Sequence, residues 1–344
     1  MENVKVISFG TGVVGGLIAK FLLEKEGVQI VGAVDVAKDK VNRDLGEVIG
    51  LNRKLGVKVS ENIETVAKQD KADIAIHTTS SFLKDTYPQM AAIVKQGINV
   101  VSTCEELSYP NFSEPKLAEQ LNDLAKKHDV TVLGTGINPG FLMDTLAITL
   151  TSACEKIDKI EIARKMNAGT RRVPFQKKVG AGLTLEEFHT KIKEKHITGH
   201  VGLEQSISMI ADALAWKLDK ITVEPVEPVI ATKKLESKDI KVDPGKVAGT
   251  KQKAKATMGN KEVVSLDFQA YIGAEEEYDS VTIKGVPNIN QKIQPCVHGD
   301  IGTVAVIVNS IPRVINAPPG LYTMKDLPVP HATPEDMRKY IKHA

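Results

Sequence analysis

A glycine-rich turn near the start of the chain constrains its fold more than any other feature. The run Gly10-Thr-Gly-Val-Val-Gly15 directly follows the apolar segment 4–9, and Asp35 closes a second apolar run twenty residues after Gly15. Glycines in such a turn permit a tight strand-to-helix connection, close approach of backbone to a pyrophosphate and close helix packing. A carboxylate after the second strand accepts hydrogen bonds from a ribose. The pattern predicts a dinucleotide-binding unit.

The expected nucleotide contacts come from this turn and from the ends of later strands. They are Gly10, Thr11, Gly12, Val13, Val14, Gly15, Asp35, Thr78, Thr79, Ser80 and Asn138. The carboxylate of Asp35 repels a 2′-phosphate and favours NAD. Basic side chains at Lys38, Lys40 and Arg43 compensate for it. We therefore expect NAD as the preferred cofactor, with NADP also accepted.

Short apolar runs alternate with amphipathic stretches over residues 1–150, which is typical of a parallel sheet covered on both faces. The predicted strands are 4–9, 29–34, 74–77, 99–102 and 131–134, and the predicted helices are 14–24, 63–68, 87–95 and 114–127. Such sheets bind ligands at the carboxyl ends of their strands. This part of the chain is predicted to be an α/β domain with a Rossmann-type, doubly wound parallel sheet.

The pattern changes after residue 150. Strands are predicted at 156–165, 221–232, 251–257, 263–272 and 280–284, with helices at 185–195 and 203–218 and a hairpin turn at 258–261. Successive strands without intervening helices imply a largely antiparallel sheet. We expect an α+β domain for substrate binding and dimerisation over 151–298. The last segment, 299–344, is expected to pack its helix, 302–315, back on the first domain.

Composition excludes several classes of protein. The 45 Lys and Arg residues balance 43 Asp and Glu residues, so no basic field indicates a nucleic acid or a membrane surface as partner. No signal peptide and no long apolar span is recognisable, and we expect a cytoplasmic protein. The three cysteines are widely spaced, and the histidines lack acidic partners at ligand spacing. No metal site is expected.

Four segments together resemble a known family. They are the glycine turn, Ser102-Thr-Cys-Glu-Glu106, Gly134-Thr-Gly-Ile-Asn-Pro-Gly-Phe141, and the stretch from Gly299-Asp300 to Ile311-Pro312-Arg313 with Ala317-Pro-Pro-Gly320 beyond it. Over nearly the whole chain they resemble the 2,4-diaminopentanoate dehydrogenases and native amine dehydrogenases, whose nucleotide domain is related to dihydrodipicolinate reductase. The His-His-x-x-Lys catalytic segment of that reductase has no match here.

The resemblance implies NAD(P)-dependent oxidative deamination of 2,4-diaminopentanoate at C4 to 2-amino-4-oxopentanoate and ammonia, or the reverse reductive amination of ketones. The implied partners are small amines, ketones and ammonia, and the implied assembly is a homodimer. Two alternatives stay open from the residues alone, because a fold does not determine a function. One is an oxo or semialdehyde reductase that does not use ammonia, and the other is a nucleotide-sensing protein without chemistry.

Amine oxidation requires a base, because hydride leaves carbon only when the nitrogen lone pair is free. Glu105 follows the predicted strand 99–102, and the family's catalytic glutamate falls on this segment. The turn decides which of Glu105 and Glu106 points inward, and we assign Glu106 to substrate binding. Solvated loop carboxylates are the alternative reading of the pair.

The other expected substrate contacts are spread over both domains. They are Phe141, Arg164, Asn167, Arg171 and His200. Residues near Arg164 and His200 line the substrate cavity in the family, and the planar guanidinium of an arginine suits a substrate carboxylate. Asn138-Pro139 is predicted to open a helix, where proline fits the first turn. Each of these residues also has a purely structural alternative.

Overall fold

The computed structural model describes residues 2–342. They form two compact units: unit 1 runs to Phe141 and resumes at Gly299, and unit 2 is Leu142–His298. The division therefore falls before the predicted boundary at residue 150. The reason is packing, because Met143 and Ala147 belong to the same buried cluster as the unit 2 residue Ile160.

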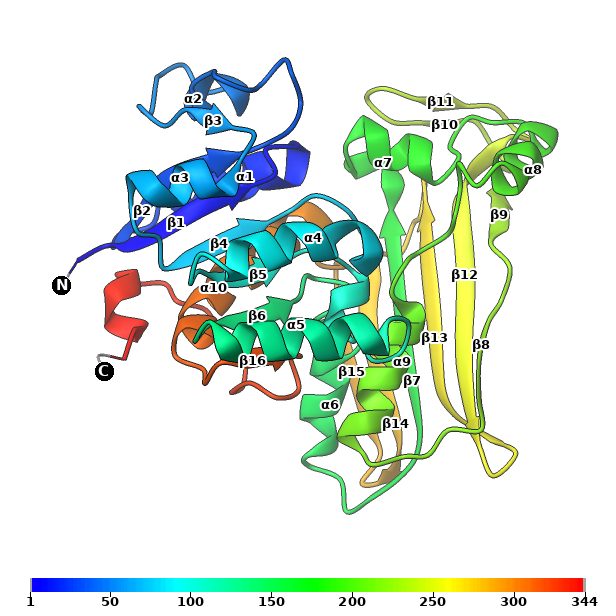
Figure 1. Cartoon of the computed structure of the whole chain (residues 1–344). Coiled ribbons are helices and arrows are strands. Elements are labelled where there is room, and N and C mark those ends of the chain that lie inside the picture. Colours follow the sequence, from blue (N-terminus) through cyan, green and yellow to red (C-terminus); the bar gives the residue numbers. More distant parts are fainter. Residues whose placement is uncertain (1, 343–344) are drawn as a thin grey trace. The chain divides into compact units, whose positions relative to one another are not determined.

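Unit 1 is built on a seven-stranded parallel sheet with the strand order β16-β6-β5-β4-β1-β2-β3 (Figure 1). The strands are β1 (Val4–Phe9), β2 (Val28–Val34), β3 (Val59–Ser60), β4 (Ile74–His77), β5 (Asn99–Ser102), β6 (Thr131–Gly134) and β16 (Gly320–Tyr322). Five of them confirm the predicted strands. The other two, β3 and β16, are too short to produce a recognisable apolar pattern.

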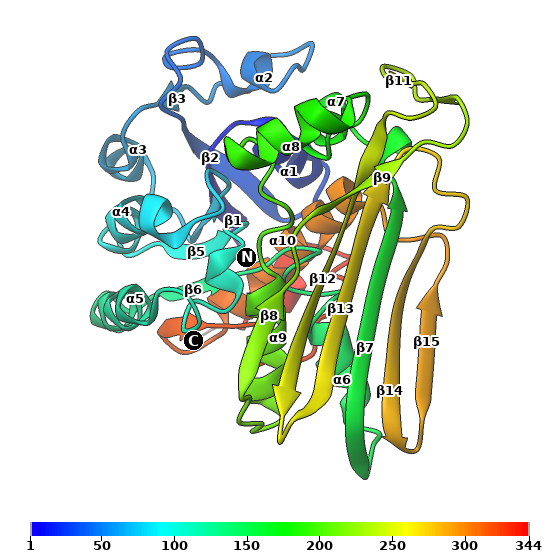
Figure 2. The same cartoon turned by 90° about the vertical axis from the view of Figure 1, so that its right-hand side faces the viewer.

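Helices cover both faces of this sheet, which confirms the doubly wound prediction. They are α1 (Val13–Leu23), α2 (Leu45–Val48), α3 (Ile63–Gln69), α4 (Leu83–Val94), α5 (Pro115–Lys127) and α10 (Gly299–Ile315), with the 3-10 helices η1 (Glu106–Ser108) and η3 (Met337–Tyr340). Figure 2 shows α3, α4 and α5 along one face and α1 with α10 on the other. The buried side chains of the central strands, such as Ile7, Val100 and Val132, form the core between the layers. Within residues 2–342, no helix is long and apolar enough to cross a membrane.

Unit 2 contains a sheet in the order β15-β14-β7-β13-β12-β8, with β9 also paired to β12. Its strands are β7 (Lys156–Asn167), β8 (Lys220–Val223), β9 (Glu227–Ile230), β12 (Val247–Met258), β13 (Lys261–Tyr271), β14 (Tyr278–Val286) and β15 (Ile289–Ile293), and β10 (Leu235–Glu236) pairs separately with β11 (Lys241–Val242). Only the β7/β13 pair of the sheet is parallel among the described residues. The largely antiparallel prediction is confirmed. So is the hairpin turn, where Met258 pairs with Lys261 and both intervening residues have positive φ.

Several element boundaries in unit 2 differ from the predictions. The expected strand 221–232 is two strands, β8 and β9, interrupted around Pro225, which lacks a backbone N–H for the ladder. The helix α9 (Leu203–Ala213) ends early, and Ala215 beyond it has a left-handed φ of 53°. The helices of unit 2 are α6 (Thr145–Thr151), α7 (Val173–Lys178), α8 (Leu185–Lys193) and α9, with the 3-10 helix η2 (Ala168–Thr170). Of these, α6 and α9 contact one face of the sheet (Figure 2).

Candidate active site

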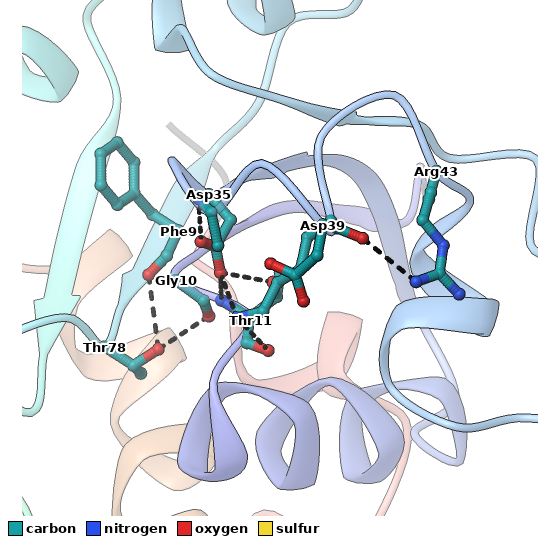
Figure 3. A network of polar contacts seen from close by, with 9 residues as sticks. Phe9, Gly10, Thr11, Asp35, Asp39, Arg43 and Thr78 are labelled. Atoms are coloured by element: carbon teal, nitrogen blue, oxygen red, sulfur yellow. Dashed lines mark hydrogen bonds and ion pairs between the residues drawn. The ribbon is translucent and has the colours of Figure 1, made fainter.

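The glycine turn joins β1 to α1 at the carboxyl edge of the unit 1 sheet (Figure 3). Gly10 has φ +93°, which L side chains rarely adopt. A Cβ added to Gly15 would lie 2.0 Å from the Gly10 carbonyl oxygen, so only glycine lets the helix begin this close to the turn. A Cβ added to Gly12, the N-cap of α1, would meet nothing within 4 Å. The turn therefore offers open space at a helix N-terminus, which fits a pyrophosphate.

Asp35 is bound into this turn through its carboxylate (Figure 3). Its Oδ2 accepts hydrogen bonds from Thr11 N (2.9 Å), Thr11 Oγ1 (2.6 Å) and Lys40 Nζ (2.8 Å), and its Oδ1 accepts one from Ala37 N (3.0 Å). Burial acts to raise the pKa of Asp35, but the hydrogen bonds from Lys40 and Thr11 outweigh it and hold the pKa well below its usual range. The residue is an anion that orders the turn.

A pocket of about 530 Å³ opens beside Asp35. Five of the predicted cofactor residues line it: Gly10, Gly12, Asp35, Thr78 and Thr79. Other walls come from Val34, Ile63, Pro88, Gln89 and Ala92. Thr78 Oγ1 donates to the Gly10 carbonyl oxygen at 2.9 Å and so holds the turn from the other side. Ser80 is directed elsewhere and donates to Asp85 Oδ2 at 3.0 Å. Apolar walls with a carboxylate at one end are suited to an adenosine group.

His77, the last residue of β4, joins this pocket to the next strand. Its side chain is fully buried, its Nδ1 lies 2.9 Å from Ser102 Oγ, and its Nε2 lies 2.7 Å from Gln89 Oε1 and 3.0 Å from Thr79 Oγ1. Burial lowers the pKa of His77 from 6.5 to about 4, although the hydrogen bond to Gln89 acts to raise it. The imidazole is neutral at physiological pH.

This buried histidine makes stability depend on pH. In the unfolded chain the pKa is near 6.5 and in the folded chain it is about 4, so the unfolded state takes up the proton first as the pH falls. The contribution of His77 to the free energy of unfolding is therefore complete above pH 6.5 and is lost as the pH falls toward 4. Lowering the pH from 7.5 to 5 should reduce the free energy of unfolding by about 2 kcal/mol through His77. Urea unfolding at both pH values measures this, and His77→Gln should show a correspondingly smaller decrease. Equal decreases in both proteins would contradict a buried neutral imidazole.

The two adjacent glutamates occupy different positions after β5. Glu106 is partly buried, and its Oε2 accepts a hydrogen bond from the Leu83 N–H (2.7 Å) at the first residue of α4. Burial raises the pKa of Glu106, although this hydrogen bond acts to lower it. This distant cap also explains why α4 begins at Leu83 and not at the predicted residue 87. Glu105 is the half-buried N-cap residue of η1, and its carbonyl oxygen accepts a hydrogen bond from Ser108 Oγ at 2.7 Å.

The loop after β6 carries Asn138 and Phe141 but does not open a helix. Residues 138–144 form a turn, the Asn138-Pro139 peptide is cis, and α6 begins only at Thr145. The prediction of a helix with proline in its first turn is therefore wrong. A Cβ at Gly140 would lie 2.5 Å from Gly136 N, so the loop folds tightly on itself. The Gly-rich composition reflects this close backbone packing.

Arg164 is an internal structural residue of unit 2. Its side chain is almost fully buried and forms an ion pair with Asp279, and its Nη2 donates to the Val297 carbonyl oxygen at 2.7 Å. Asp279 Oδ2 accepts the Val297 N–H at 2.8 Å. The pair thus fastens β7 and β14 to the segment at Val297. This arrangement differs from the expected role of Arg164, in which its guanidinium binds the carboxylate of the substrate.

The side-chain oxygen and the backbone N–H of Asn167 also form hydrogen bonds within unit 2. Its Oδ1 accepts hydrogen bonds from Gly169 N (2.9 Å) and Gly273 N (3.2 Å), which caps η2. Its own N–H donates to Glu277 Oε2 at 2.8 Å. These contacts link the end of β7 to the loop after β13.

Phe175 contacts Arg171 and also lines the small pocket that contains His200. The guanidinium of Arg171 stacks over the Phe175 ring at 4.6 Å, and Phe175 and His200 both line a small pocket of about 30 Å³. The His200 ring stacks on Phe268 at 4.4 Å, and its buried Nε2 has no hydrogen-bond partner among residues 2–342.

Burial, with Lys178 and Arg164 nearby, lowers the pKa of His200 to about 3. The cluster therefore presents a neutral imidazole next to cations. The pocket residues Phe175 and Lys178 were not anticipated, because α7 is too short to show a helical pattern. Gln252 was also missed, although it lies on β12 within a predicted strand. Within the described chain, no group of three or more His, Cys, Asp or Glu side chains is arranged to hold a metal ion.

Comparison with known proteins identifies the family. The model of the 2,4-diaminopentanoate dehydrogenase C-terminal domain matches residues 141–343, and that of the dihydrodipicolinate reductase N-terminus matches residues 4–131. The chain is 38% identical to 2,4-diaminopentanoate dehydrogenase of Acetoanaerobium sticklandii, over 99% of this chain and 98% of that protein. It is 26% identical to an amine dehydrogenase of Streptomyces virginiae over 63% of this chain and 61% of the relative.

A solved structure agrees with this similarity. The amine dehydrogenase from Mycobacterium smegmatis matches with a TM-score of 0.84 at 28% identity, covering 97% of this chain and 98% of the other. The match extends through both units and therefore includes the nucleotide pocket and the unit 2 sheet. Together with the full-length sequence similarity, it confirms the resemblance inferred from the motifs. The chain belongs to the 2,4-diaminopentanoate dehydrogenase family of oxidoreductases.

Proposed function

We propose that this protein oxidises the C4 amine of 2,4-diaminopentanoate to give 2-amino-4-oxopentanoate and ammonia, and that the reaction is reversible as reductive amination. Its relatives make it an NAD(P)-dependent oxidoreductase that acts on amines. The observation that carries the choice of substrate is the 38% identity to a 2,4-diaminopentanoate dehydrogenase over almost the full length of both chains.

The residues of the unit 1 pocket suit the cofactor. Gly12 and the N-terminus of α1 would hold its pyrophosphate, and Asp35 would hold its adenosine ribose. A cofactor held there would supply the hydride acceptor for the carbon that carries the amine. The other requirements of the reaction fall on the protein, which must free the amine lone pair and stabilise the positive charge that develops on nitrogen.

Glu105 is the residue we assign to both tasks. It follows β5, and the family's catalytic glutamate falls on this segment. A carboxylate at this position takes one proton from the substrate ammonium. After it passes this proton to solvent, the side chain is again an anion and favours the iminium that forms when hydride leaves. Water then adds to the iminium carbon, and collapse of the adduct releases ammonia and leaves the ketone.

Asp35 should determine the choice between NAD and NADP. In Asp35→Ala the repulsion of a 2′-phosphate disappears, and Lys40, which lies 2.8 Å from Oδ2, becomes available to that phosphate. A hydrogen bond to a charged group contributes about 1.5–3 kcal/mol, so the kcat/KM ratio should shift toward NADP by about tenfold or more. Steady-state kinetics with both cofactors measures it, and Lys40→Met in the same background should reverse the gain. An unchanged ratio would reject this role of Asp35.

Arg171 is our candidate for the substrate carboxylate, because Arg164 is occupied by Asp279. The half-buried guanidinium of Arg171 stacks on Phe175, which holds it in one orientation. Arg171→Met should raise KM for 2,4-diaminopentanoate about tenfold or more, the cost of one charge-assisted hydrogen bond, while monoamines without a carboxylate are little affected. Arg172→Met is the matched control. Equal losses on diamino acid and monoamine would indicate damage to the fold or to cofactor binding.

A homodimer through the open face of the unit 2 sheet is part of this proposal. On β7, Ile160 and Ile162 face the core, and the alternating residues Lys159 and Glu161 face outward. Lys159 pairs with Glu161 (2.7 Å) and with Glu262 (2.8 Å), so this face carries interspersed charges of both signs. A twofold axis would place this same face of two copies together, where side chains of opposite charge can also pair between subunits. Light scattering after size-exclusion chromatography should give twice the monomer mass.

A substrate screen tests the proposed activity. Purified protein is incubated with NAD or NADP and a panel of 2,4-diaminopentanoate, other diamino acids and simple amines, and cofactor reduction is followed. We expect the highest kcat/KM for 2,4-diaminopentanoate. Reduction of ketones at a rate independent of ammonium would instead indicate an oxo reductase, and cofactor binding without turnover of any amine would indicate a sensor.

A further inference from the structure

A continuous line of hydrogen bonds crosses the carboxyl edge of the unit 1 sheet. It starts at the Cys104 N–H, which donates to Ser102 Oγ at 3.1 Å. It continues from Ser102 through the His77 ring to Gln89 Oε1, where Thr79 Oγ1 also donates at 2.6 Å. Cys104 is the residue before Glu105, and both Gln89 and Thr79 line the nucleotide pocket. The line therefore joins the pocket to the backbone that carries the proposed base.

The donor and the acceptor of each hydrogen bond in this line follow from the chemistry of its groups. An amide oxygen only accepts hydrogen bonds, so the contact of Gln89 Oε1 with His77 requires the proton on Nε2. The His77 Nδ1 is then an acceptor. Ser102 Oγ, which already accepts from the Cys104 N–H, donates its own proton to Nδ1. Every group in the line is satisfied by one arrangement of hydrogens.

Backbone contacts fix the two loops against each other around this line. The Thr103 N–H donates to the His77 carbonyl oxygen at 3.0 Å, and the Glu106 N–H donates to the Ser81 carbonyl oxygen at 3.1 Å. The His77 ring is fully buried and also contacts Phe9, with ring centroids 5.3 Å apart. An apolar side chain at this position would fill the same space. The imidazole adds an acceptor on one side and a donor on the other.

We propose that His77 is a positioning residue that couples occupancy of the nucleotide pocket to the placement of the Glu105 loop. A nucleotide that orders Gln89 and Thr79 also orders the imidazole, and through Ser102 the imidazole orients the peptide before Glu105. The effect on turnover rests on the proposed role of Glu105. The coupling itself is a property of binding and does not depend on that role.

Two variants of His77 each remove the hydrogen bond on one side of the ring and keep the one on the other side. The amide of His77→Gln takes the place of Nε2 and keeps a donor for Gln89, but it removes the acceptor for Ser102. The amide of His77→Asn takes the place of Nδ1 and keeps an acceptor for Ser102, but it loses Gln89. Loss of one hydrogen bond corresponds to roughly three- to tenfold. We expect the main effect of His77→Gln to be a lower kcat, with a rise of only about threefold in the dissociation constant of NADH, and the main effect of His77→Asn to be a rise of about tenfold in that dissociation constant. A residue that only fills space would change both quantities in parallel in both variants, which would overturn the proposal.

The NADH dissociation constant also tests the coupling without any turnover. Ser102 is outside the pocket lining, yet Ser102→Ala should weaken NADH binding about threefold in the wild-type background and not further in His77→Gln. Equal effects in both backgrounds would refute the coupling. If Glu105→Gln retained full activity while this dependence on His77 held, the assigned base would be wrong and the coupling would stand.

Nitrogen-15 NMR of the wild-type protein provides a check that requires no variant to fold. The His77 ring should give the pattern of the Nε2–H tautomer at neutral pH, with Nδ1 unprotonated. In the Nδ1–H tautomer, Nδ1 would donate to Ser102 Oγ and the unprotonated Nε2 would face the acceptor Gln89 Oε1, which would contradict the proposal.

Discussion

Glu105→Gln should lower kcat for amine oxidation by at least about 100-fold, because general acid–base groups contribute about 10²–10⁴-fold. The amide preserves the shape of the side chain but removes both the base and the negative charge. The nucleotide pocket does not include Glu105, so the dissociation constant of NADH should stay within about twofold of wild type, well below the cost of one lost hydrogen bond to a charged group. Stopped-flow measurement of cofactor reduction and fluorescence titration with NADH give the two values.

Glu106→Gln is the matched control. Its amide oxygen can still accept the hydrogen bond from the Leu83 N–H, so α4 keeps its cap and turnover should fall by less than about tenfold. If Glu106→Gln is the inactive variant, the base is Glu106. If neither variant loses more than about tenfold, the acid–base mechanism on this loop is wrong.

Arg164→Met should reduce the free energy of unfolding by about 3–5 kcal/mol, the usual cost of leaving one partner of a buried ion pair without the other. Asp279 is almost fully buried and would lose its cation. Burial raises the pKa of Asp279, although the charge of Arg164 and the hydrogen bonds from the Val297 N–H and Arg164 act to lower it. Urea unfolding followed by circular dichroism measures the loss.

Lys251→Met supplies the comparison on the same sheet. Lys251 pairs with Glu227 at 2.8 Å, but both side chains are exposed, and such pairs contribute about 0–1 kcal/mol. If Arg164→Met were as stable as wild type and instead raised KM for the diamino acid, the arginine would be a substrate contact, as its place in the sequence first suggested.

The contrast between Arg164 and the glycine turn of unit 1 shows which parts of the structure can be predicted from sequence. The strands of unit 1 and the three glycines depend on local periodicity and on turn geometry, and both are visible in a few neighbouring residues. Arg164 depends on Asp279, which lies 115 residues away in the chain. Nothing near Arg164 distinguishes a buried ion pair from a ligand clamp.

The same limit applies to the helix boundaries and to the candidate site. The start of α4 depends on a cap from Glu106, and the boundary of unit 2 depends on the burial of Met143 and Ala147 in a core completed by later strands. The sequence also left open which of Glu105 and Glu106 points inward, and the contact of Glu106 with the Leu83 N–H cannot be seen in the neighbouring residues. By contrast, Asp35 was predictable because its partners, Thr11 and Lys40, belong to the same βαβ unit.

The ratio of ammonia released to NADH formed during oxidation of 2,4-diaminopentanoate tests the central claim most directly. Each hydride removed from C4 produces one iminium, and its hydrolysis releases one ammonia and one ketone. We therefore predict one ammonia and one 2-amino-4-oxopentanoate for every NADH. Formation of NADH without ammonia, or reduction of the ketone without any requirement for ammonium, would contradict an amine dehydrogenase.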